Sequence, residues 1–172
     1  MIRKASFAPV VGPAVRLLLL GSLPGEASLR AERYYAHPQN QFWRLAGAAI
    51  GYEDLHGLDY EDRLAALLEN GVGLWDVVAD AVRPGSLDGA IRDHRPNDLV
   101  ALIARLPGLR AIGFNGGTAA RIGRKMIGES GDIALIDLPS SSPAYTLSYA
   151  VKREQWLRLS EFLGANGEFV EK

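Results

Sequence analysis

Cysteine is missing from this chain of 172 residues, and histidine occurs only three times. Without cysteine the protein can form no disulfide, thiolate zinc site or cysteine-bound iron–sulfur cluster, and it has no thiol nucleophile. The three histidines are scattered along the sequence, so we expect no metal site built from protein side chains. A formal net charge of −1 indicates no overall preference for a polyanionic partner. Basic residues gather only locally, at 92–95 and 121–125, in patterns typical of solvated faces.

Long apolar segments are also missing. The longest apolar run, Leu17 to Leu20, is far too short to span a bilayer, so no membrane association is expected. Residues 1–15 lack an apolar core followed by a small-residue cleavage site, which predicts no secretory signal and a cytoplasmic location. No internal repeat, low-complexity tract or linker divides the chain. Residues 1–172 are therefore predicted to form one domain, and we expect a monomer.

Short apolar runs that end in glycine, serine or proline alternate with helical patterns along the chain. Buried strands are predicted over 16–22, 73–78, 109–114 and 132–138. Helices are predicted over 39–50, 60–70, 98–106 with Asn97 as N-cap, from after Gly117 to about Met126, and over 150–163. Strands separated by helices imply a parallel sheet that is covered on both faces. The prediction is a three-layer α/β/α sandwich with a central, mainly parallel four-stranded sheet.

The loops that follow the predicted strands are rich in glycine, serine and proline. In open parallel sheets, ligands bind at the carboxyl ends of the strands. Here those ends are 22–25, Asp76, 115–117 and 140–143. A helix that starts after Gly116 and Gly117 offers an anion site. The first loop, GSLPG, has neither the GxGxxG spacing nor the lysine of a P-loop, so no nucleotide cofactor is expected.

Three segments together resemble the uracil-DNA glycosylase superfamily: GSLPG at 21–25, YYAHPQNQFW at 34–43 and LPSSSPAYT at 138–146. The similarity is greatest to its hypoxanthine-DNA (deoxyinosine) glycosylase branch, near the mismatch-specific uracil/thymine glycosylases, and covers about 16–163. It implies hydrolysis of the N-glycosidic bond to a deaminated base in DNA, with hypoxanthine first and uracil second. The product would be an abasic site, and no cofactor is needed. The absence of cysteine argues against the iron–sulfur members and against a zinc base deaminase.

Base recognition is assigned by this resemblance to the first two segments and to Asp76. A flipped base must be held by its edge and its face. Tyr35, in preference to Tyr34, is the expected stacking wall; the alternative is that it only packs beside its aromatic neighbours. Asp76 is expected to accept the N1–H of hypoxanthine, while a backbone N–H of the Ser22–Leu23 loop donates to O6. Alternatively, Asp76 caps a turn or pairs with Arg83.

The expected catalytic residue is Asn40. In uracil-specific relatives, the third residue of the first motif is an aspartate or asparagine that orients water, but here it is Leu23. The hypoxanthine branch is thought to use the asparagine that Asn40 matches, and an amide can both accept from water and donate to substrate. The alternative is that Asn40 only caps its helix. Leu23 also makes credible a DNA-binding module that has lost catalysis, and a hydrolase of free nucleosides is a third possibility.

Contacts to the DNA backbone are expected from several loops. His37 is expected to contact a phosphate or to hold its loop. The segment 140–146 corresponds to the loop that relatives push into the minor groove, where Tyr145 would act as a wedge. The alternative is that this segment is only a serine-rich turn between a strand and a helix, which needs no ligand. The remaining candidates for phosphate or sugar contacts are Asn115, Gly116, Gly117, Ser141, Ser142 and Pro143.

Overall fold

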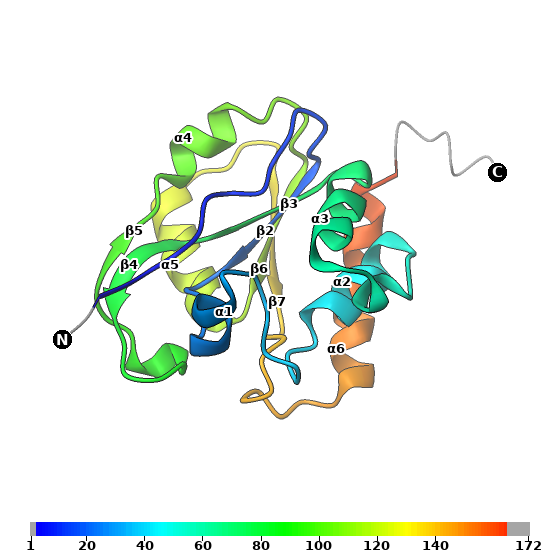
Figure 1. The fold of residues 1–172 in the computed structure, drawn as a ribbon. Coiled ribbons are helices and arrows are strands. Elements are labelled where there is room, and N and C mark those ends of the chain that lie inside the picture. The colour runs from blue at the N-terminus through cyan, green and yellow to red at the C-terminus, as the bar shows by residue number, and fades with distance from the viewer. Residues whose placement is uncertain (1–2, 165–172) are drawn as a thin grey trace.

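Four parallel strands form the centre of the computed structural model, which describes residues 3–164 (Figure 1). Their order is β3-β2-β6-β7, and β2 pairs with both β3 and β6, with Leu17 opposite Val72 and Ala111. Every residue of β2 and β6 is buried. The strands are β2 (Leu17–Gly21), β3 (Val72–Asp76), β6 (Ala111–Asn115) and β7 (Ala134–Leu138). This confirms the predicted parallel sheet.

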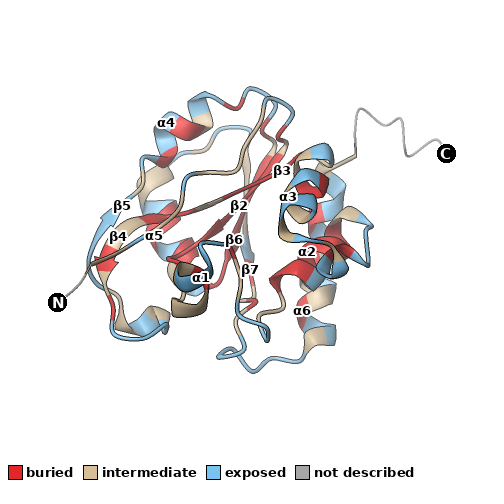
Figure 2. Ribbon diagram, in the orientation of Figure 1, coloured by how far each residue is buried: buried red, intermediate tan, exposed pale blue. Residues whose placement is uncertain are grey.

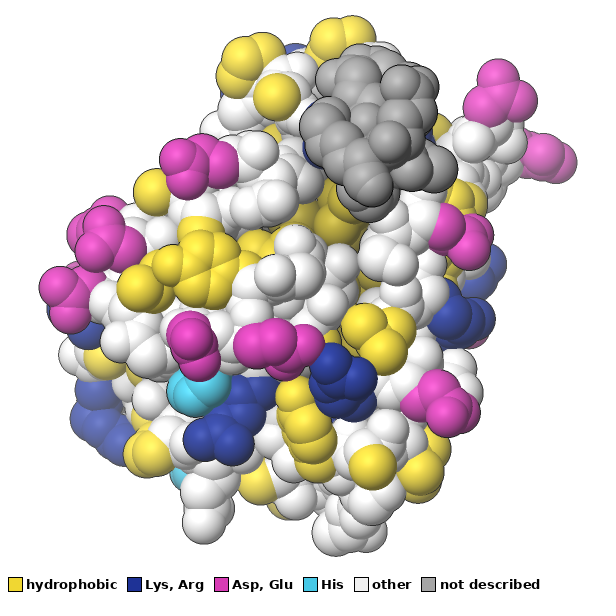
Figure 3. Space-filling model, turned by 90° about the vertical axis from the view of Figure 1, so that its right-hand side faces the viewer, with side chains coloured by type: hydrophobic (Ala, Val, Ile, Leu, Met, Phe, Trp, Pro, Cys, Tyr) yellow, Lys and Arg dark blue, Asp and Glu magenta, His cyan; other side chains and the backbone are white. Residues whose placement is uncertain are grey.

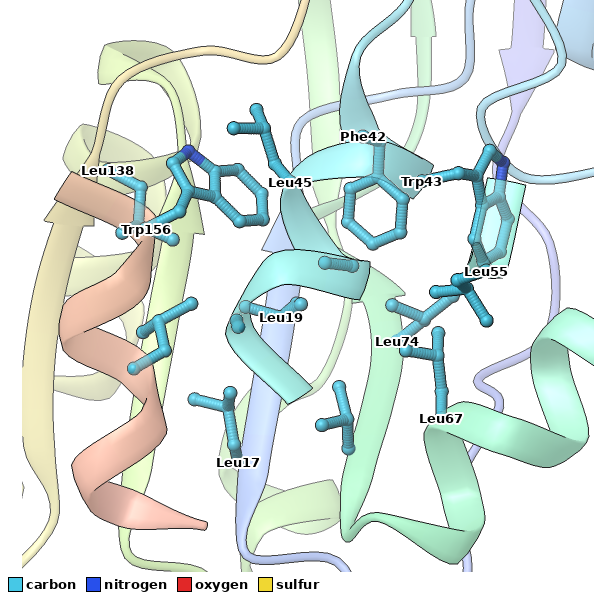
Figure 4. Close-up of a cluster of buried hydrophobic side chains, with 14 of the residues drawn as sticks. Leu17, Leu19, Phe42, Trp43, Leu45, Leu55, Leu67, Leu74, Leu138 and Trp156 are labelled. Carbon is cyan, nitrogen blue, oxygen red and sulfur yellow. The ribbon is translucent and has the colours of Figure 1, made fainter. Parts of the chain in front are cut away.

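Helices cover both faces of this sheet, and the run of leucines in β2 explains how both faces are filled. Leu17 and Leu19 point into one core cluster, while Leu18 and Leu20 point into the other, as the alternation of a strand requires. Figure 4 shows the first cluster, in which Phe42, Trp43 and Trp156 pack against the β2 leucines. Buried residues accordingly follow the sheet and the inner sides of the helices in Figure 2.

The helices differ from the predicted ones mainly at their ends. They are α1 (Glu26–Ala31), α2 (Phe42–Ile50), α3 (Tyr60–Glu69), α4 (Leu99–Ala104), α5 (Gly117–Ile127) and α6 (Tyr149–Trp156). In the described part of the chain, 3₁₀ turns occupy Leu55–Gly57, Asp88–Ala90 and Leu157–Phe162. Helix α1 was not predicted. Helix α4 is capped by Asp98, whose Oδ1 accepts from the Ala101 N–H at 3.0 Å, and not by Asn97. The Asn97 amide instead donates to the Asp76 carbonyl at 2.7 Å.

A second sheet, absent from the sequence prediction, extends the first at one side. It contains β1 (Arg3–Ala5), β4 (Val78–Val82) and β5 (Arg92–Pro96), all antiparallel, in the order β1-β4-β5. The strand predicted over 73–78 is thus two strands, which separate at Val77. Strand β5 is exposed at every residue and has no apolar alternation, which explains why its sequence did not predict a strand.

The described part of the chain contains no helix that is long and apolar enough to cross a membrane. Within residues 3–164, no group of three or more histidines, aspartates or glutamates is placed to hold a metal ion. Figure 3 views the molecule from the right-hand side of Figure 1, and on this face both basic and acidic side chains occur. This face therefore presents no surface of a single charge.

Candidate active site

A cleft of about 440 Å³ opens at the carboxyl edge of the parallel sheet. It brings together the three segments that carry the family resemblance, as the topology predicted. We call it the central cleft. Its lining consists of residues 21–28, Tyr34, Tyr35, His37, Asn40, Asp76, residues 86–88, Asn115 and residues 140–145.

Arg83 fixes the first loop from behind. Its side chain is only 1% exposed, and its guanidinium donates to the carbonyls of Leu23 and Pro24 and, at 3.0 Å, to that of Gly85. Three loop carbonyls therefore accept hydrogen bonds from the buried guanidinium, which would otherwise leave its donors unpaired. No ion pair joins Arg83 to Asp76 among the described residues, so the predicted alternative of such a pair is wrong. Sequence reasoning did not foresee that this arginine shapes the loop.

Tyr35 stands at the floor of the central cleft on a strained backbone. Its φ is +53°, a left-handed conformation that a bulky residue rarely adopts and that often marks functional sites. Two contacts hold it there. Its ring stacks on Phe42 with centroids 3.9 Å apart and planes inclined by 10°, and its carbonyl accepts from the Trp43 indole N–H at 3.1 Å. Tyr34, by contrast, is buried and donates its hydroxyl to the Ala8 carbonyl.

Asp76, at the end of β3, is buried beside Tyr35. A Cβ added to Gly21 would lie 2.7 Å from both Asp76 Oδ1 and the Tyr35 hydroxyl, so these two groups converge on the glycine. The Tyr35 hydroxyl and Asp76 Oδ2 have no hydrogen-bond partner among the described residues. Buried polar atoms of native proteins are seldom left unpaired. The floor of the cleft therefore has unused polar capacity that a polar ligand edge can satisfy.

A second carboxylate, Asp88, shares this region and was not found by sequence reasoning. Its Oδ1 accepts from the Ser22 hydroxyl at 2.6 Å. Burial and then repulsion from Asp88 raise the pKa of Asp76 to about 7, although Arg83 opposes the shift. Burial likewise raises the pKa of Asp88, against the Ser22 hydrogen bond and the charge of Arg83. A proton can therefore remain on Asp76 near neutral pH, and its carboxyl can then donate as well as accept.

Asn40 lies at the mouth of the cleft, two residues before helix α2. The helix begins at Phe42 and not at the predicted residue 39, and its N-cap is Gln41. Asn40 Oδ1 accepts from the Phe42 N–H at 2.9 Å. This bond fixes the amide while leaving its N–H₂ group and a second lone pair on the oxygen. His37 is exposed at the same mouth, and its Nδ1 accepts from the Gln39 N–H at 3.1 Å. That bond leaves Nε2 for an outside partner.

The serine-rich loop forms the other wall and is held by two buried groups. The Asn115 amide donates to the Ser141 hydroxyl at 2.9 Å and accepts from the Ser141 N–H at 2.8 Å, so Asn115 is engaged within the protein. Lys152 is buried, and burial lowers the pKa of its ammonium group. It donates to Gln41 Oε1 at 3.0 Å and to the Ser142 carbonyl at 3.2 Å, and it lies 5.5 Å from the Tyr145 ring centre.

Two predicted contacts lie outside the central cleft. Neither Gly116 nor Gly117 lines it, and the Gly116 N–H donates to the carbonyls of Phe114 and Leu138. Gly116 has a φ of +100° and is the N-cap of α5. The other predicted site residues all line the cleft: Ser22, Leu23, Tyr35, His37, Asn40, Asp76, Asn115, Ser141, Ser142, Pro143 and Tyr145.

Comparisons with known proteins agree with this geometry. A family model described as the uracil DNA glycosylase superfamily matches residues 8–162. A protein of Methanosarcina acetivorans named hypoxanthine DNA glycosylase is 39% identical over 153 residues, which cover 89% of this chain and 95% of the relative. A protein of the same name from Methanosarcina barkeri is 44% identical over 115 residues, covering 67% and 72%. A solution NMR structure from M. acetivorans, provisionally named a uracil DNA glycosylase, matches with a TM-score of 0.84 and 37% identity, covering 95% of this chain and all of that one.

Proposed function

Because the chain belongs to the uracil DNA glycosylase superfamily, we propose that it hydrolyses the N-glycosidic bond of a deaminated base in DNA, with hypoxanthine as the preferred base. The observation that carries this proposal is the central cleft, where the three motif segments meet around unpaired polar groups. The product is an abasic site and the free base. DNA is thus the proposed partner, and we retain the expectations of a single-domain monomer in the cytoplasm.

The floor of the cleft suits the edge of hypoxanthine. Its N1–H is a donor and its O6 is an acceptor. A protonated Asp76 carboxyl offers one acceptor and one donor side by side, which matches this pair, and the raised pKa of Asp76 favours that form. Tyr35, backed by Phe42, supplies the flat surface for the base. Stacking of a base on an aromatic ring contributes about 1–3 kcal/mol.

Asn40 is proposed to position the water that attacks C1′ of the sugar. The amide cannot take a proton, so it orients the water and does not deprotonate it. This suits a path in which the C1′–N9 bond breaks first, its electron pair leaves with the base, and water then adds to an oxocarbenium-like sugar and releases a proton to solvent. The Phe42 N–H bond to Asn40 Oδ1 holds the amide in one orientation beforehand, which is how a fixed polar group assists such a step.

Uracil is the second candidate base, because the family model and the NMR structure both carry that name. Uracil presents the same N–H and carbonyl arrangement to Asp76 as hypoxanthine does. Against it stands Leu23, which is 6% exposed and lines the cleft where uracil-specific relatives have a polar residue. We therefore place uracil after hypoxanthine.

The proposal is tested with labelled oligonucleotides that contain deoxyinosine, deoxyuridine or deoxyxanthosine, single- and double-stranded. Alkali-labile breaks are expected first at deoxyinosine, and an absence of breaks at all three bases overturns the proposal. Asn40→Ala should reduce excision by about 100-fold, in the range of effects of a lost transition-state contact.

A matched variant separates catalysis from helix capping. Asp98→Ala likewise removes a side-chain acceptor for a backbone N–H in the first turn of a helix, since Asp98 Oδ1 accepts from the Ala101 N–H of α4, and Asp98 does not line the cleft. Both variants should lose about 1 kcal/mol of stability. Only Asn40→Ala should lose excision; equal excision in the two variants would restrict Asn40 to its structural role.

A further inference from the structure

Leu87 is a large apolar side chain left exposed at the mouth of the central cleft. It is 62% exposed and nevertheless belongs to the cleft lining. Among the large hydrophobic side chains of the described residues, no other reaches this exposure; Val100, on α4 and away from the cleft, follows at 55%. A leucine in water forgoes the free energy that burial would give it. Its position beside the path of an incoming base suggests that a ligand covers it.

The segment that carries Leu87 is held at each neighbouring residue. The Gly85 carbonyl accepts from Lys4 Nζ at 2.8 Å and from Arg83 Nε at 3.0 Å. The Ser86 hydroxyl accepts from the Glu26 N–H at 2.8 Å, and Asp88 accepts from Ser22 at 2.6 Å. The backbone is thus anchored while the Leu87 side chain projects outward. An anchored apolar tip loses little entropy when it inserts into a partner.

The topology places Leu87 at the opposite wall from Tyr145. Leu87 follows β4, which continues from the edge strand β3, whereas Tyr145 follows the other edge strand, β7. The two loops are accordingly well separated along the lower edge of Figure 1. Tyr145 is 48% exposed and also lines the cleft. Two exposed apolar side chains therefore flank one opening. Strand β5, which follows Leu87 in the sequence, is exposed and carries two basic side chains, Arg92 and Arg95.

We propose that Leu87 is a second wedge, which inserts into the DNA duplex from the wall opposite Tyr145 and helps to expel the damaged nucleotide into the central cleft. This inference rests on the proposed glycosylase function. Expelling a base leaves an apolar gap between neighbouring base pairs, and an aliphatic side chain can fill such a gap and compensate for lost stacking. Because Asp88 bonds to Ser22, the wedge is directly connected to the loop at the cleft floor.

The test compares Leu87→Ala with Val100→Ala, which is the same kind of truncation at an exposed apolar residue outside the cleft. Single-turnover excision of hypoxanthine is measured on three substrates. One is an ordinary deoxyinosine duplex. The other two, a single strand and a duplex with a pyrene nucleotide opposite deoxyinosine, do not require a wedge, since the base is already free or is displaced by pyrene.

Leu87→Ala should lower the rate on the ordinary duplex by about tenfold or more, which is the scale of one lost unstacking contribution, and Val100→Ala should not. On the pyrene duplex and the single strand, Leu87→Ala should match the wild type wherever the wild type acts. An unchanged rate on the ordinary duplex overturns the proposal, and so does an equal loss on every substrate. Failure of the wild type on all substrates would instead refute the glycosylase function itself.

Discussion

Replacing Asp76 by asparagine should stabilise the protein at alkaline pH, by an amount that falls as the pH is lowered and vanishes near pH 4. The Asp76 side chain is 3% exposed, and its Oδ2 has no hydrogen-bond partner among the described residues. Within residues 3–164 no cation forms an ion pair with it, since the nearby Arg83 is bonded to loop carbonyls. Ionised Asp76 is therefore a buried charge that Arg83 offsets only in part, and asparagine keeps the shape without that charge.

The size of the effect follows from the pKa. Burial and repulsion from Asp88 raise the pKa of Asp76 from 3.8 to about 7. Each tenfold change in proton affinity corresponds to about 1.4 kcal/mol, so ionising Asp76 costs the folded protein on the order of 4 kcal/mol. An unfolded chain releases this proton near pH 4 and the folded protein near pH 7. The folded state thus binds more protons between these values, and its stability falls as the pH rises through them.

Urea denaturation of wild type and Asp76→Asn at pH 5, 6, 7 and 8 measures the difference directly. The free energy of unfolding of the variant should exceed that of the wild type at pH 8, by up to about 4 kcal/mol, and the gap should shrink steadily towards pH 5. Asp54→Asn, at an exposed aspartate, controls for the general effect of removing a carboxylate. A difference that is constant from pH 5 to 8 would refute the reasoning, as would a less stable variant at pH 8.

Three further predictions concern the walls and floor of the cleft. Gly21→Ala should displace the Tyr35 hydroxyl and Asp76 and lower excision, measured by single-turnover kinetics, whereas Gly57→Ala, with no atom within 4 Å of the added Cβ, should not. Tyr35→Ala should weaken binding of a deoxyinosine oligonucleotide by about 1–3 kcal/mol, measured by fluorescence anisotropy, because the stacking surface is lost; unchanged affinity would contradict the assignment. Lys152→Met should cost about 1–3 kcal/mol of unfolding free energy, measured by denaturation, since Gln41 and the Ser142 carbonyl lose their donor; exposed Lys125→Met is the control.

The sequence predicted the parts of the fold that depend on short-range patterns. Four consecutive leucines indicate a strand buried on both faces, and the structure places them alternately in two cores. Parallel strands bring the loops that follow them to one edge of the sheet. The meeting of GSLPG, YYAHPQNQFW and SSSP in one cleft could therefore be predicted without knowing any side-chain contact. The second sheet was missed because β1 has three residues and β5 is polar throughout.

The supporting charges of the site could not be predicted. Arg83, Asp88 and Lys152 lie outside the recognised motifs, and nothing in their local sequence distinguishes them from solvated charges. Each makes a hydrogen bond to a residue far away in the sequence: Arg83 to residues 59 and 60 positions away, Asp88 to one 66 positions away and Lys152 to one 111 positions away. For Asn40, sequence reasoning left capping and catalysis as alternatives. The N-cap of α2 is Gln41 and not Asn40. The bond that Asn40 Oδ1 accepts from the Phe42 N–H is compatible with a catalytic amide because it uses one lone pair.

A DNA glycosylase breaks the bond between a deaminated base and its sugar and leaves the DNA backbone intact. The most direct measurement is chromatographic detection of free base after incubation with a deoxyinosine duplex, combined with the mass of the remaining DNA. We expect one free hypoxanthine for each modified nucleotide and a strand whose mass corresponds to an abasic site. Intact deoxyinosine, or a cut backbone that still carries the base, would contradict it.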